Sequence, residues 1–497
     1  NKGNEKIFTF KDISLYSNKI ANLLLDKGIK KGDVVMSMLN RRYEFYLLSM
    51  ACCKIGAIII PATYLLTTKD IIYRCEKAEV KMIVTINEAE VTEHVSEAIK
   101  SCPVVQKVYA IGEHPEFENF CEAYQSYPDT APVCKRPEMS DTMLVYFTSG
   151  TTGWPKMVAH NFKYPLGHII NAYYWHNVID DGLHFTMAET GWAKFSWGKL
   201  YGQWLAGSAV FCYDYFGRFT PTDILPLIGK FGINTFCAPP TIYRFFIKED
   251  LTKYDFSSLK SCTTAGEALN GEVSRQFKKA TGIEIREGFG QTETSSLLAT
   301  YKYIDAHPGS MGRPSPNYEI KLMMDGREVK DGEEGEIVIK IKDNQFGLLM
   351  GYYKEDEKTK EIYSKGYYHT GDLAYRDSSD YYWFVGRKDD IIKSSGYRIG
   401  PFEVESALIS HPAVLECAIT AVPDPLRGQI VKATIVLAKG IEGTDELKKE
   451  LQEHTKRITA PYKYPRIIEF VTELPKTISG KIKHKDIRQK DHETMNQ

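Results

Sequence analysis

Apolar and polar positions follow two different patterns along the chain. In its first part, continuous apolar runs such as 33–39 and 81–86 predict strands buried on both faces of a parallel sheet. Residues 14–28 instead place apolar side chains at helical spacing and end at Gly28, a typical helix terminator. Residues 44–60 predict a helix that leads directly into a strand.

Three further stretches, 208–213, 233–240 and 261–269, repeat a strand followed by a turn. Strands that alternate with helices predict an α/β architecture built on parallel sheets. Beyond about residue 310 the pattern changes, because residues 318–329 and 335–341 alternate apolar and polar positions between turn residues. This alternation is typical of antiparallel strands.

The last part of the chain predicts a separate unit. From residue 386 onward, short helices and strands form a smaller unit of about 110 residues. No low-complexity linker separates it from the rest, so we expect a tight hinge, with the "RKDD" segment at 387–390 as the candidate. The predicted domains cover residues 1–388 and 389–497.

Composition narrows the classes of function. The 497 residues, of which 43% are hydrophobic, suffice for two or more domains with sizeable cores. The formal net charge of −1 does not favour a nucleic-acid partner, and no apolar run approaches the roughly 18 residues that span a bilayer. The ten cysteines form no Cys-x-x-Cys pair, so we expect neither a zinc site nor a disulfide framework, and a cytoplasmic location.

The stretch "TSGTTGWPK" at 148–156 combines glycines, hydroxyls and a lysine directly after the apolar run "MLVYF". Glycine allows tight turns that bring backbone N–H groups close to a ligand, and hydroxyls and an ammonium suit phosphate oxygens. It is not the common P-loop, because Pro155 replaces the second glycine of that motif and Met157 replaces its magnesium-binding hydroxyl. A polar turn after a buried strand is the structural alternative for this stretch.

Five more motifs follow in order: "AGEAL" (265–269), "EGFGQTE" (287–293), "YHTGD" (368–372), "GRKDDIIKSSGYRIGPFEVE" (386–405) and "LPKTISGK" (474–481). With 148–156 they resemble, in the same order, the motifs of the adenylate-forming enzymes, which include acyl-CoA synthetases, firefly luciferase and peptide-synthetase adenylation domains. Each motif alone is weak, but six in register cover essentially the whole chain. The stretches "TAPYKYPR" and "VPDPLRGQ" resemble the medium-chain acyl-CoA synthetase branch in particular.

This resemblance implies a large N-terminal domain of doubly wound sheets with a small β-barrel, and a small, mobile α+β C-terminal domain. It also implies a two-step reaction. A carboxylate attacks the α-phosphate of ATP and pyrophosphate leaves, and the thiol of coenzyme A then displaces AMP from the acyl-adenylate. Phosphoryl transfer of this kind needs positioned positive charge more than covalent help. The expected ligands are therefore ATP, Mg²⁺, coenzyme A and a small carboxylic acid.

The resemblance assigns an ATP site as well. Its members are Thr148, Ser149, Gly150, Thr151, Thr152, Gly153, Lys156, Gly266, Glu267, Ala268, Glu287, Gly288, Phe289, Gly290, Gln291, Thr292, Asp372, Arg387 and Lys481. Thr292 would hydrogen-bond the α-phosphate, and Glu293 would coordinate Mg²⁺, which favours one carboxylate together with phosphate oxygens and water. Phe289 would stack on adenine. A carboxylate in the first turn of a helix and a core aromatic are the structural alternatives for Glu293 and Phe289.

Further roles follow from the same motifs. Asp372 would accept both ribose hydroxyls and Arg387 would contact the same ribose, with an Asx-turn as the alternative for Asp372. Lys481 completes the predicted catalytic set of Lys481, Thr292 and Glu293, because its charge would offset that of the α-phosphate and carboxylate as they react. Lys156 would add charge at the pyrophosphate, or would be an ordinary surface lysine.

Lys481 and the coenzyme A contacts belong to the same small domain and cannot occupy the site together. The family rotates that domain between the two half-reactions, and Asp389 matches the hinge position. The coenzyme A candidates, whose cations suit phosphates, are Ser395, Gly396, Tyr397, Arg398, Arg427, Tyr464, Pro465 and Arg466. Arg398 could instead contact the ATP phosphates in the first conformation.

The acyl pocket is predicted at Gly290 and Trp192. Acetate-specific relatives carry a tryptophan at the position of Gly290, so the resemblance implies space left open here for a medium-chain or branched acid. Phe195 and Trp197 in "GWAKFSWG" would form further walls, or would be core aromatics.

Rival functions are an aryl-CoA ligase, a luciferase-type oxygenase and a non-catalytic nucleotide-binding relative. The complete motif set argues against the last of these. A peptide-synthetase adenylation domain is disfavoured because the coenzyme A motifs are present. The sequence leaves the oligomeric state open, with a homodimer as one expectation.

Overall fold

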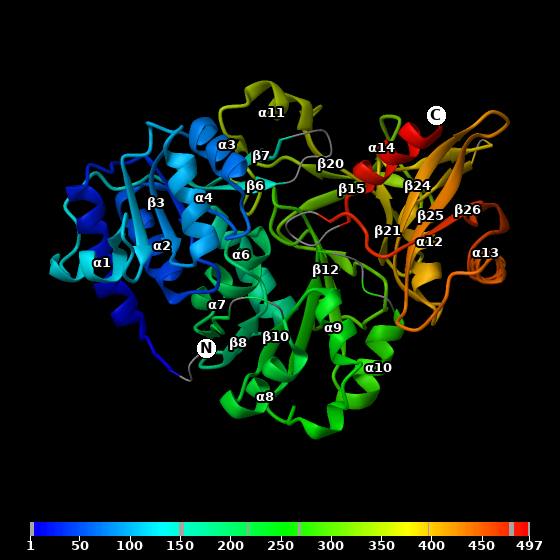
Figure 1. Ribbon diagram of the computed structural model, residues 1–497, viewed down its shortest axis with the longest axis horizontal. Coiled ribbons are helices and arrows are strands. Elements are labelled where there is room, and N and C mark those ends of the chain that lie inside the picture. Colours follow the sequence, from blue (N-terminus) through cyan, green and yellow to red (C-terminus); the bar gives the residue numbers. More distant parts are fainter. Residues whose placement is uncertain are drawn as a thin grey trace.

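The computed structural model describes residues 4–148, 154–215, 217, 219–266, 269, 271–395, 397–476 and 482–495 (Figure 1). Three sheets occupy the N-terminal and central parts of the chain, and a fourth lies in the C-terminal part. Within these described residues, no helix is long and apolar enough to cross a membrane.

The first sheet has eight strands in the order β18-β7-β6-β2-β1-β3-β4-β5. They are β1 (Val34–Met38), β2 (Ile58–Pro61), β3 (Val80–Ile86), β4 (Lys107–Ile111), β5 (Glu118–Asn119), β6 (Thr142–Thr148), β7 (Lys156–Asn161) and β18 (Gly351–Tyr352). The predicted strands at 33–39 and 81–86 are confirmed as β1 and β3, which pair in parallel. At one end of the sheet β7 pairs antiparallel to β6, and the edge strand β18 pairs antiparallel to β7, which the apolar runs did not predict.

The helices that pack with this sheet are α1 (Phe10–Asp26), α2 (Tyr43–Ile55), α3 (Thr68–Ala78), α4 (Ala89–Ile99) and the short α5 (Phe120–Ala123). α1 begins at a capping box in which Thr9 and Asp12 bond each other's backbone N–H groups. α2 ends at Gly56, whose φ of 72° lets the chain turn directly into β2. The predicted helix that leads into a strand is therefore confirmed.

The second sheet has the order β14-β13-β12-β11-β10-β8-β9. Its strands are β8 (Leu183–Thr186), β9 (Ala209–Phe211), β10 (Thr235–Cys237), β11 (Ser261–Ala265), β12 (Ile285–Phe289), β13 (Leu298–Ala299) and β14 (Arg313–Pro314). The five strands β8 to β12 pair in parallel, as the strand-and-turn stretches predicted. The α-helices of this region are α6 (Ala193–Lys199), α7 (Tyr201–Leu205), α8 (Pro221–Phe231), α9 (Pro240–Phe246) and α10 (Gly271–Thr281).

The third sheet is antiparallel, as the alternating pattern beyond residue 310 predicted. Its strands are β15 (Glu319–Met324), β16 (Arg327–Glu328), β17 (Gly335–Lys340), β19 (Tyr363–Ser364), β20 (Tyr367–Arg376) and β21 (Tyr382–Arg387), and α11 (Asp356–Ile362) precedes β19. The pairings among the described residues run from β16 to β19, with β21 added beside β20. This sheet stands where the resemblance implied a small barrel.

The fourth sheet belongs to the C-terminal part, drawn in orange and red in Figure 1. It consists of β22 (Ile392–Ser394), β23 (Tyr397–Ile399), β24 (Val414–Asp424), β25 (Gly428–Leu437) and β26 (Ile467–Val471), with the helices α12 (Pro401–Ile409), α13 (Asp445–Ile458) and α14 (His484–Met495). A separate hydrophobic cluster lies inside it. The predicted domain boundary at 388/389 falls between β21 and β22.

Candidate active site

The residues that follow β12 lie where the first three sheets meet. On one side, His160 of β7 bonds the Thr292 carbonyl at 2.8 Å. On the other, the Gln291 side chain bonds Asp372 of β20. The "EGFGQTE" motif therefore connects strands from all three sheets, so that side chains far apart in the sequence converge on one place.

Gln291 is held by three groups of β20. Its amide nitrogen donates to the Asp372 carboxylate (2.5 Å) and to the Thr370 carbonyl (2.8 Å). Its amide oxygen accepts from the buried Tyr368 hydroxyl (2.7 Å). The structure thus brings two members of the predicted ATP site, Gln291 and Asp372, into direct contact. Tyr368 is a further site residue that the sequence reasoning missed, although it lies inside the quoted "YHTGD" motif.

Arg387, at the end of β21, adds a positive charge to this group. It pairs with Asp372 Oδ1 at 3.5 Å and with Asp389 at 3.6 Å. Burial lowers the pKa of its guanidinium, but Asp372 and Asp389 more than offset this, so the pKa is raised and the group stays charged. The candidate hinge residue Asp389 therefore contacts the site directly, and the neighbouring Asp390 forms an ion pair with Arg488 of α14.

Glu293 and Lys156 meet through Tyr352 of β18. The Tyr352 hydroxyl donates to Glu293 Oε1 (3.1 Å), and the Lys156 ammonium lies 3.4 Å from that hydroxyl and 4.8 Å from the ring centre. Burial and the Glu293 charge raise the pKa of Tyr352, so the phenol remains a donor. Tyr352 was also missed by the sequence reasoning. It links the lysine at the end of the Gly/Thr loop to the predicted metal ligand.

Glu293 fits a magnesium ligand of the expected kind. Among the described residues, no group of three or more His, Cys, Asp or Glu side chains is arranged to hold a metal ion by itself. Magnesium commonly takes one or two carboxylates and completes its shell with phosphate oxygens and water. A single carboxylate held by a neutral hydroxyl is compatible with an ion that arrives with ATP.

His160 is a third missed residue. It is completely buried, its ring stacks on Tyr164 with centres 3.8 Å apart, and burial lowers its pKa to about 4. The imidazole is therefore neutral at physiological pH, and Nε2 must carry the proton because the Thr292 carbonyl can only accept. His160 fixes the backbone at Thr292, the residue predicted to bond the α-phosphate. Its position on β7, four residues after Lys156, was the available signal.

Both carboxylate oxygens of Glu287 are hydrogen-bonded within the protein. The side chain is buried, and its two carboxylate oxygens accept from the backbone N–H groups of Leu269 (3.1 Å) and Gly309 (2.7 Å). Burial raises its pKa to about 7. Glu287 therefore holds the end of the "AGEAL" motif against the turn at 307–310. Glu287 would therefore act on ATP only indirectly, by holding the end of this motif in place.

The open space for an acyl chain at Gly290 stays a prediction, but the position of a Cβ on Gly290 itself is filled by neighbours. A Cβ atom on Gly290 would lie 2.5 Å from Cη2 of Trp197 and 2.8 Å from the Ser295 carbonyl oxygen. A Cβ on Gly288 would similarly lie 2.4 Å from the Trp175 ring. Each glycine of the "GFG" segment thus packs directly against one indole ring. A tryptophan at position 290 would occupy the volume that Trp197 already fills.

The tryptophans themselves are firmly placed. The indole of Trp197 is almost completely buried and its Nε1 donates to the Thr294 carbonyl (3.2 Å). Trp175, on a π-helical turn at 171–176, donates to the Arg286 carbonyl (3.1 Å). Phe195 is a core aromatic packed against Phe45, and Trp192 is half-buried. Trp197 is therefore the wall beside Gly290, and Phe195 belongs to the core of the first sheet.

The predicted adenine side of the site contains Gly266 and Phe289. Gly266 has a φ of 98° and its missing side chain would meet no atom within 4 Å. Phe289 is half-buried and packs against Phe384 with ring centres 5.9 Å apart. The Phe289 ring is therefore in contact with one neighbour while keeping an accessible part.

Several predicted residues lie outside the described residues. They are Ser149, Gly150, Thr151, Thr152, Gly153, Glu267, Ala268, Gly396 and Lys481. The segments beside the Gly/Thr loop are placed by firm contacts: Thr148 pairs with Lys156 across β6 and β7, and Trp154 stacks on Tyr73 with ring centres 4.4 Å apart.

Three coenzyme A candidates, Ser395, Tyr397 and Arg427, lie on or directly beside strands of the fourth sheet. The Ser395 N–H donates to the Arg427 carbonyl (2.9 Å), and Tyr397 stacks on Tyr462 with ring centres 4.1 Å apart. Tyr462 stands two residues before the "YPR" triplet, so the hairpin at 392–399 and the triplet are neighbours.

The remaining candidates are arranged differently. Arg466 donates to the Tyr464 hydroxyl (2.7 Å), and the Pro465 carbonyl accepts from Gln452 of α13 (3.0 Å). Arg398 is exposed and contacts the sulfur of Met324 on β15 (3.4 Å). Arg398 therefore lies between the C-terminal part and the third sheet.

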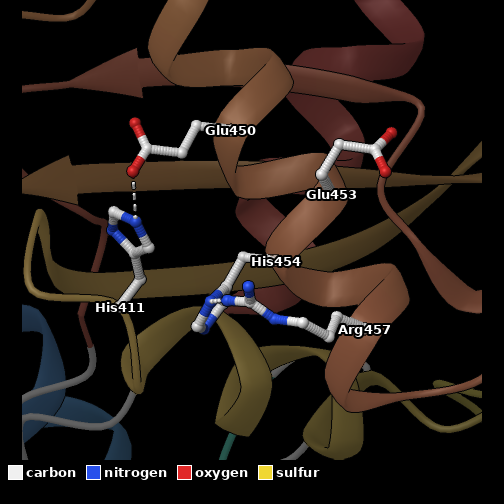
Figure 2. Close-up of a pocket in the computed structure, with 5 residues that line it drawn as sticks. All are labelled: His411, Glu450, Glu453, His454 and Arg457. Carbon is white, nitrogen blue, oxygen red and sulfur yellow. Dashed lines mark hydrogen bonds and ion pairs between the residues drawn. The ribbon is translucent and has the colours of Figure 1, made fainter.

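Two cavities lie in the C-terminal part and contain none of the predicted site residues. The cavity of about 370 Å³ in Figure 2 is lined by His411, Glu450, Glu453, His454 and Arg457. His411 bonds Glu450 (3.1 Å), and His454 bonds Arg457 (3.2 Å), so both imidazoles are occupied within the protein.

Comparison with known proteins agrees with the motif order. Residues 2–353 match the model of the "AMP-binding enzyme" family, and residues 403–481 match the "AMP-binding enzyme C-terminal domain". The chain is 41% identical to the mouse (Mus musculus) protein "Acyl-coenzyme A synthetase ACSM3, mitochondrial", over 98% of this chain and 85% of that protein. It is also 41% identical to the human "Acyl-coenzyme A synthetase ACSM5, mitochondrial", with the same coverage.

Solved structures show the same architecture. An anthranilate CoA ligase in complex with anthranoyl-AMP superimposes with a TM-score of 0.90 at 29% identity, over 99% of this chain and 93% of that chain. An acyl-CoA synthetase of Brucella canis matches with a TM-score of 0.72 at 34% identity, over 98% and 89% of the two chains. The predicted fold class and resemblance are confirmed, and this chain belongs to the AMP-binding enzyme family.

Proposed function

We propose that this protein is an AMP-forming acyl-CoA synthetase that activates a medium-chain or branched carboxylic acid. The observation that carries the proposal is the convergence of Lys156, Glu293, Gln291, Asp372 and Arg387 where three sheets meet. These groups supply cations, a metal ligand and a carboxylate for a nucleotide. Full-length similarity to proteins named acyl-coenzyme A synthetases supports the second half-reaction, with coenzyme A as acceptor.

In the first half-reaction, this chain's residues would bind and orient ATP. Glu293 would hold Mg²⁺, which supplies Lewis-acid neutralisation of the phosphate charge. Lys156, kept beside Glu293 by Tyr352, would add charge at the departing pyrophosphate. Thr292 would bond the α-phosphate from the position that His160 fixes, and Lys481 would offset charge as the substrate carboxylate attacks.

In the second half-reaction, the C-terminal part would bind coenzyme A. The guanidinium groups of Arg427, Arg398 and Arg466 suit its phosphates. The contact between Tyr397 and Tyr462 supports a shared surface for the hairpin and the "YPR" triplet. A rotation at Asp389 would exchange this surface for Lys481 between the two steps.

The acid specificity is the finer part of the proposal. Trp197 lies against Gly290, so its indole would form one wall of the acyl pocket, which suits an apolar acyl chain. We propose acids of about four to eight carbons, each buried methylene contributing about 0.8 kcal/mol. An aryl acid is the second candidate, because the anthranilate CoA ligase shares this architecture at 29% identity.

The test is pyrophosphate release from ATP with acetate, butyrate, 2-methylbutyrate, hexanoate, octanoate, benzoate and anthranilate, with and without coenzyme A. We expect sustained release only with coenzyme A and the best kcat/KM for an acid of four to eight carbons. Best activity with benzoate or anthranilate would select the aryl candidate. Pyrophosphate release that proceeds at the same sustained rate without coenzyme A would contradict the synthetase.

Assembly and compartment remain predictions. A homodimer is tested by light scattering of the purified protein. The cytoplasmic expectation rests on cysteine usage, and all ten cysteines are free thiols in the structure. The names of the mammalian relatives place those proteins in mitochondria.

A further inference from the structure

The hydrogen bonds around Gln291 define a single orientation of its amide. The Tyr368 hydroxyl approaches Oε1, whereas two acceptors, the Asp372 carboxylate and the Thr370 carbonyl, approach Nε2. If the amide were turned over, its oxygen would face both acceptors and its nitrogen would face the Tyr368 hydroxyl. That arrangement would place oxygen against oxygen twice, so the Asp372 carboxylate and the Thr370 carbonyl select the orientation in which Gln291 donates to Asp372, and the Tyr368 hydroxyl completes it by donating to the amide oxygen.

Tyr368 is suited to this role by its surroundings. It is almost completely buried on β20, and its hydroxyl donates to the amide oxygen of Gln291. Burial and the nearby charge of Glu293 raise the pKa of the phenol, so it remains protonated and donates throughout the physiological range. The hydrogen bond from the Tyr368 hydroxyl to the Gln291 amide oxygen is therefore kept at physiological pH.

Asp372 is the end of this chain of contacts. Gln291 binds its Oδ2 and Arg387 lies 3.5 Å from its Oδ1, and the side chain is 5% exposed. A carboxylate offers about four acceptor positions, two on each oxygen. Two neighbouring hydroxyls, as on a ribose, require that both oxygens keep a fixed direction. An amide of fixed orientation on Oδ2 provides that constraint.

We propose that Tyr368 is a positioning residue for ribose recognition, which through Gln291 fixes the Asp372 carboxylate in the direction that accepts the two ribose hydroxyls of ATP. The inference rests on the proposed function, because it takes ATP as the ligand of Asp372. Tyr368 does not touch the nucleotide in this scheme. Its effect is on discrimination between ATP and analogues that lack one hydroxyl.

The experiment compares Tyr368→Phe with a matched control, Tyr363→Phe. Tyr363 is a neighbouring aromatic, with its ring centre 5.7 Å from that of Tyr368, and its hydroxyl donates to the Leu349 carbonyl (2.9 Å). Each variant thus loses one hydrogen bond of a tyrosine hydroxyl, but only Tyr368→Phe removes a hydrogen bond from Gln291. Affinity for ATP, 2′-deoxyATP and 3′-deoxyATP is measured by calorimetry with the full chain, and pyrophosphate-release kinetics follow.

Wild type and Tyr363→Phe should prefer ATP over each deoxy analogue by about 10- to 100-fold, the effect of losing a hydrogen bond to a charged group. In Tyr368→Phe this preference should fall to about threefold or less. At saturating ATP its kcat should change less than its KM, because only binding geometry is disturbed. An unchanged preference in Tyr368→Phe, or an equal loss in Tyr363→Phe, overturns the proposal.

A second variant covers the case in which Tyr368→Phe does not fold. Gln291→Leu removes the amide between Tyr368 and Asp372 and should lose the preference equally, and the double variant should lose no more. A larger loss in the double variant refutes the relay. Binding needs no acid substrate, so a wild type that prefers ATP but activates no acid would contradict the proposed function, while the comparison of Tyr368→Phe with Tyr363→Phe would still decide the role of Tyr368. A wild type that binds ATP and both analogues equally overturns the ribose role itself.

Discussion

Replacing Gly290 by alanine should destabilise the protein through steric conflict with two neighbours. The new Cβ would lie 2.5 Å from Cη2 and 3.0 Å from Cζ2 of Trp197, and 2.8 Å from the Ser295 carbonyl oxygen. Carbon atoms in favourable contact are about 3.5–4.0 Å apart, so the indole would have to move by about 1 Å. The backbone oxygen of Ser295 cannot yield without moving the segment after β12.

The expected cost follows from what the Trp197 indole would lose. Overpacking a buried site costs about 1–3 kcal/mol, and displacing the ring also weakens its hydrogen bond to the Thr294 carbonyl, worth about 1 kcal/mol. We therefore expect the free energy of unfolding to fall by about 2–4 kcal/mol. Because the shortest contact is with the indole ring, adding Trp197→Phe should recover about 1–2 kcal/mol relative to the sum of the single changes, while the conflict with the Ser295 oxygen remains.

Urea unfolding followed by tryptophan fluorescence and circular dichroism measures these differences. Gly271→Ala is the control, since its Cβ would have no neighbour closer than 3.4 Å at the start of α10, and it should be neutral or stabilising by up to about 1 kcal/mol. If Gly290→Ala were as stable as this control, or if Trp197→Phe gave it no relief, Trp197 would not occupy the space beside Gly290. The same variants assayed on the acid panel report whether that space belongs to the acyl pocket.

Three further changes test other parts of the site. Glu287 has its pKa raised by burial to about 7 from an ordinary 4.5, so the folded protein holds this proton more tightly than the unfolded chain. The free energy of unfolding should consequently decrease by up to about 3 kcal/mol as pH rises from about 4.5 to 7, and Glu287→Gln should remove this slope in urea titrations across that range. Lys481→Ala should lower adenylate formation by about 10²–10³-fold while largely sparing thioester formation from supplied acyl-AMP, and an equal loss in both assays of a folded variant would contradict the domain rotation. Asp389→Pro should preserve one half-reaction and abolish the other, because proline fixes φ near −65°; normal turnover would remove Asp389 from the hinge.

Local patterns in the sequence were sufficient for the framework of the fold. The apolar runs at 33–39 and 81–86 became β1 and β3, and the alternating residues 318–329 became antiparallel strands. These patterns are readable because burial on two faces, one face or one helical stripe imposes its own period on neighbouring positions. Motif order was equally sufficient for the family, since six short motifs in register rarely occur by accident.

The contacts inside the site were decided by the tertiary structure. Tyr368 and Gln291 are 77 positions apart, and His160 and Thr292 are 132 apart, so no local period relates them. Glycine at 290 was readable, but whether its missing side chain leaves space or seats a ring depends on where Trp197 packs. Residue types and their order determined which chemistry this chain can perform. The contacts between side chains depend on how the three sheets pack around the end of β12. In a closely packed interior, each space is filled by the residue that the tertiary structure places beside it.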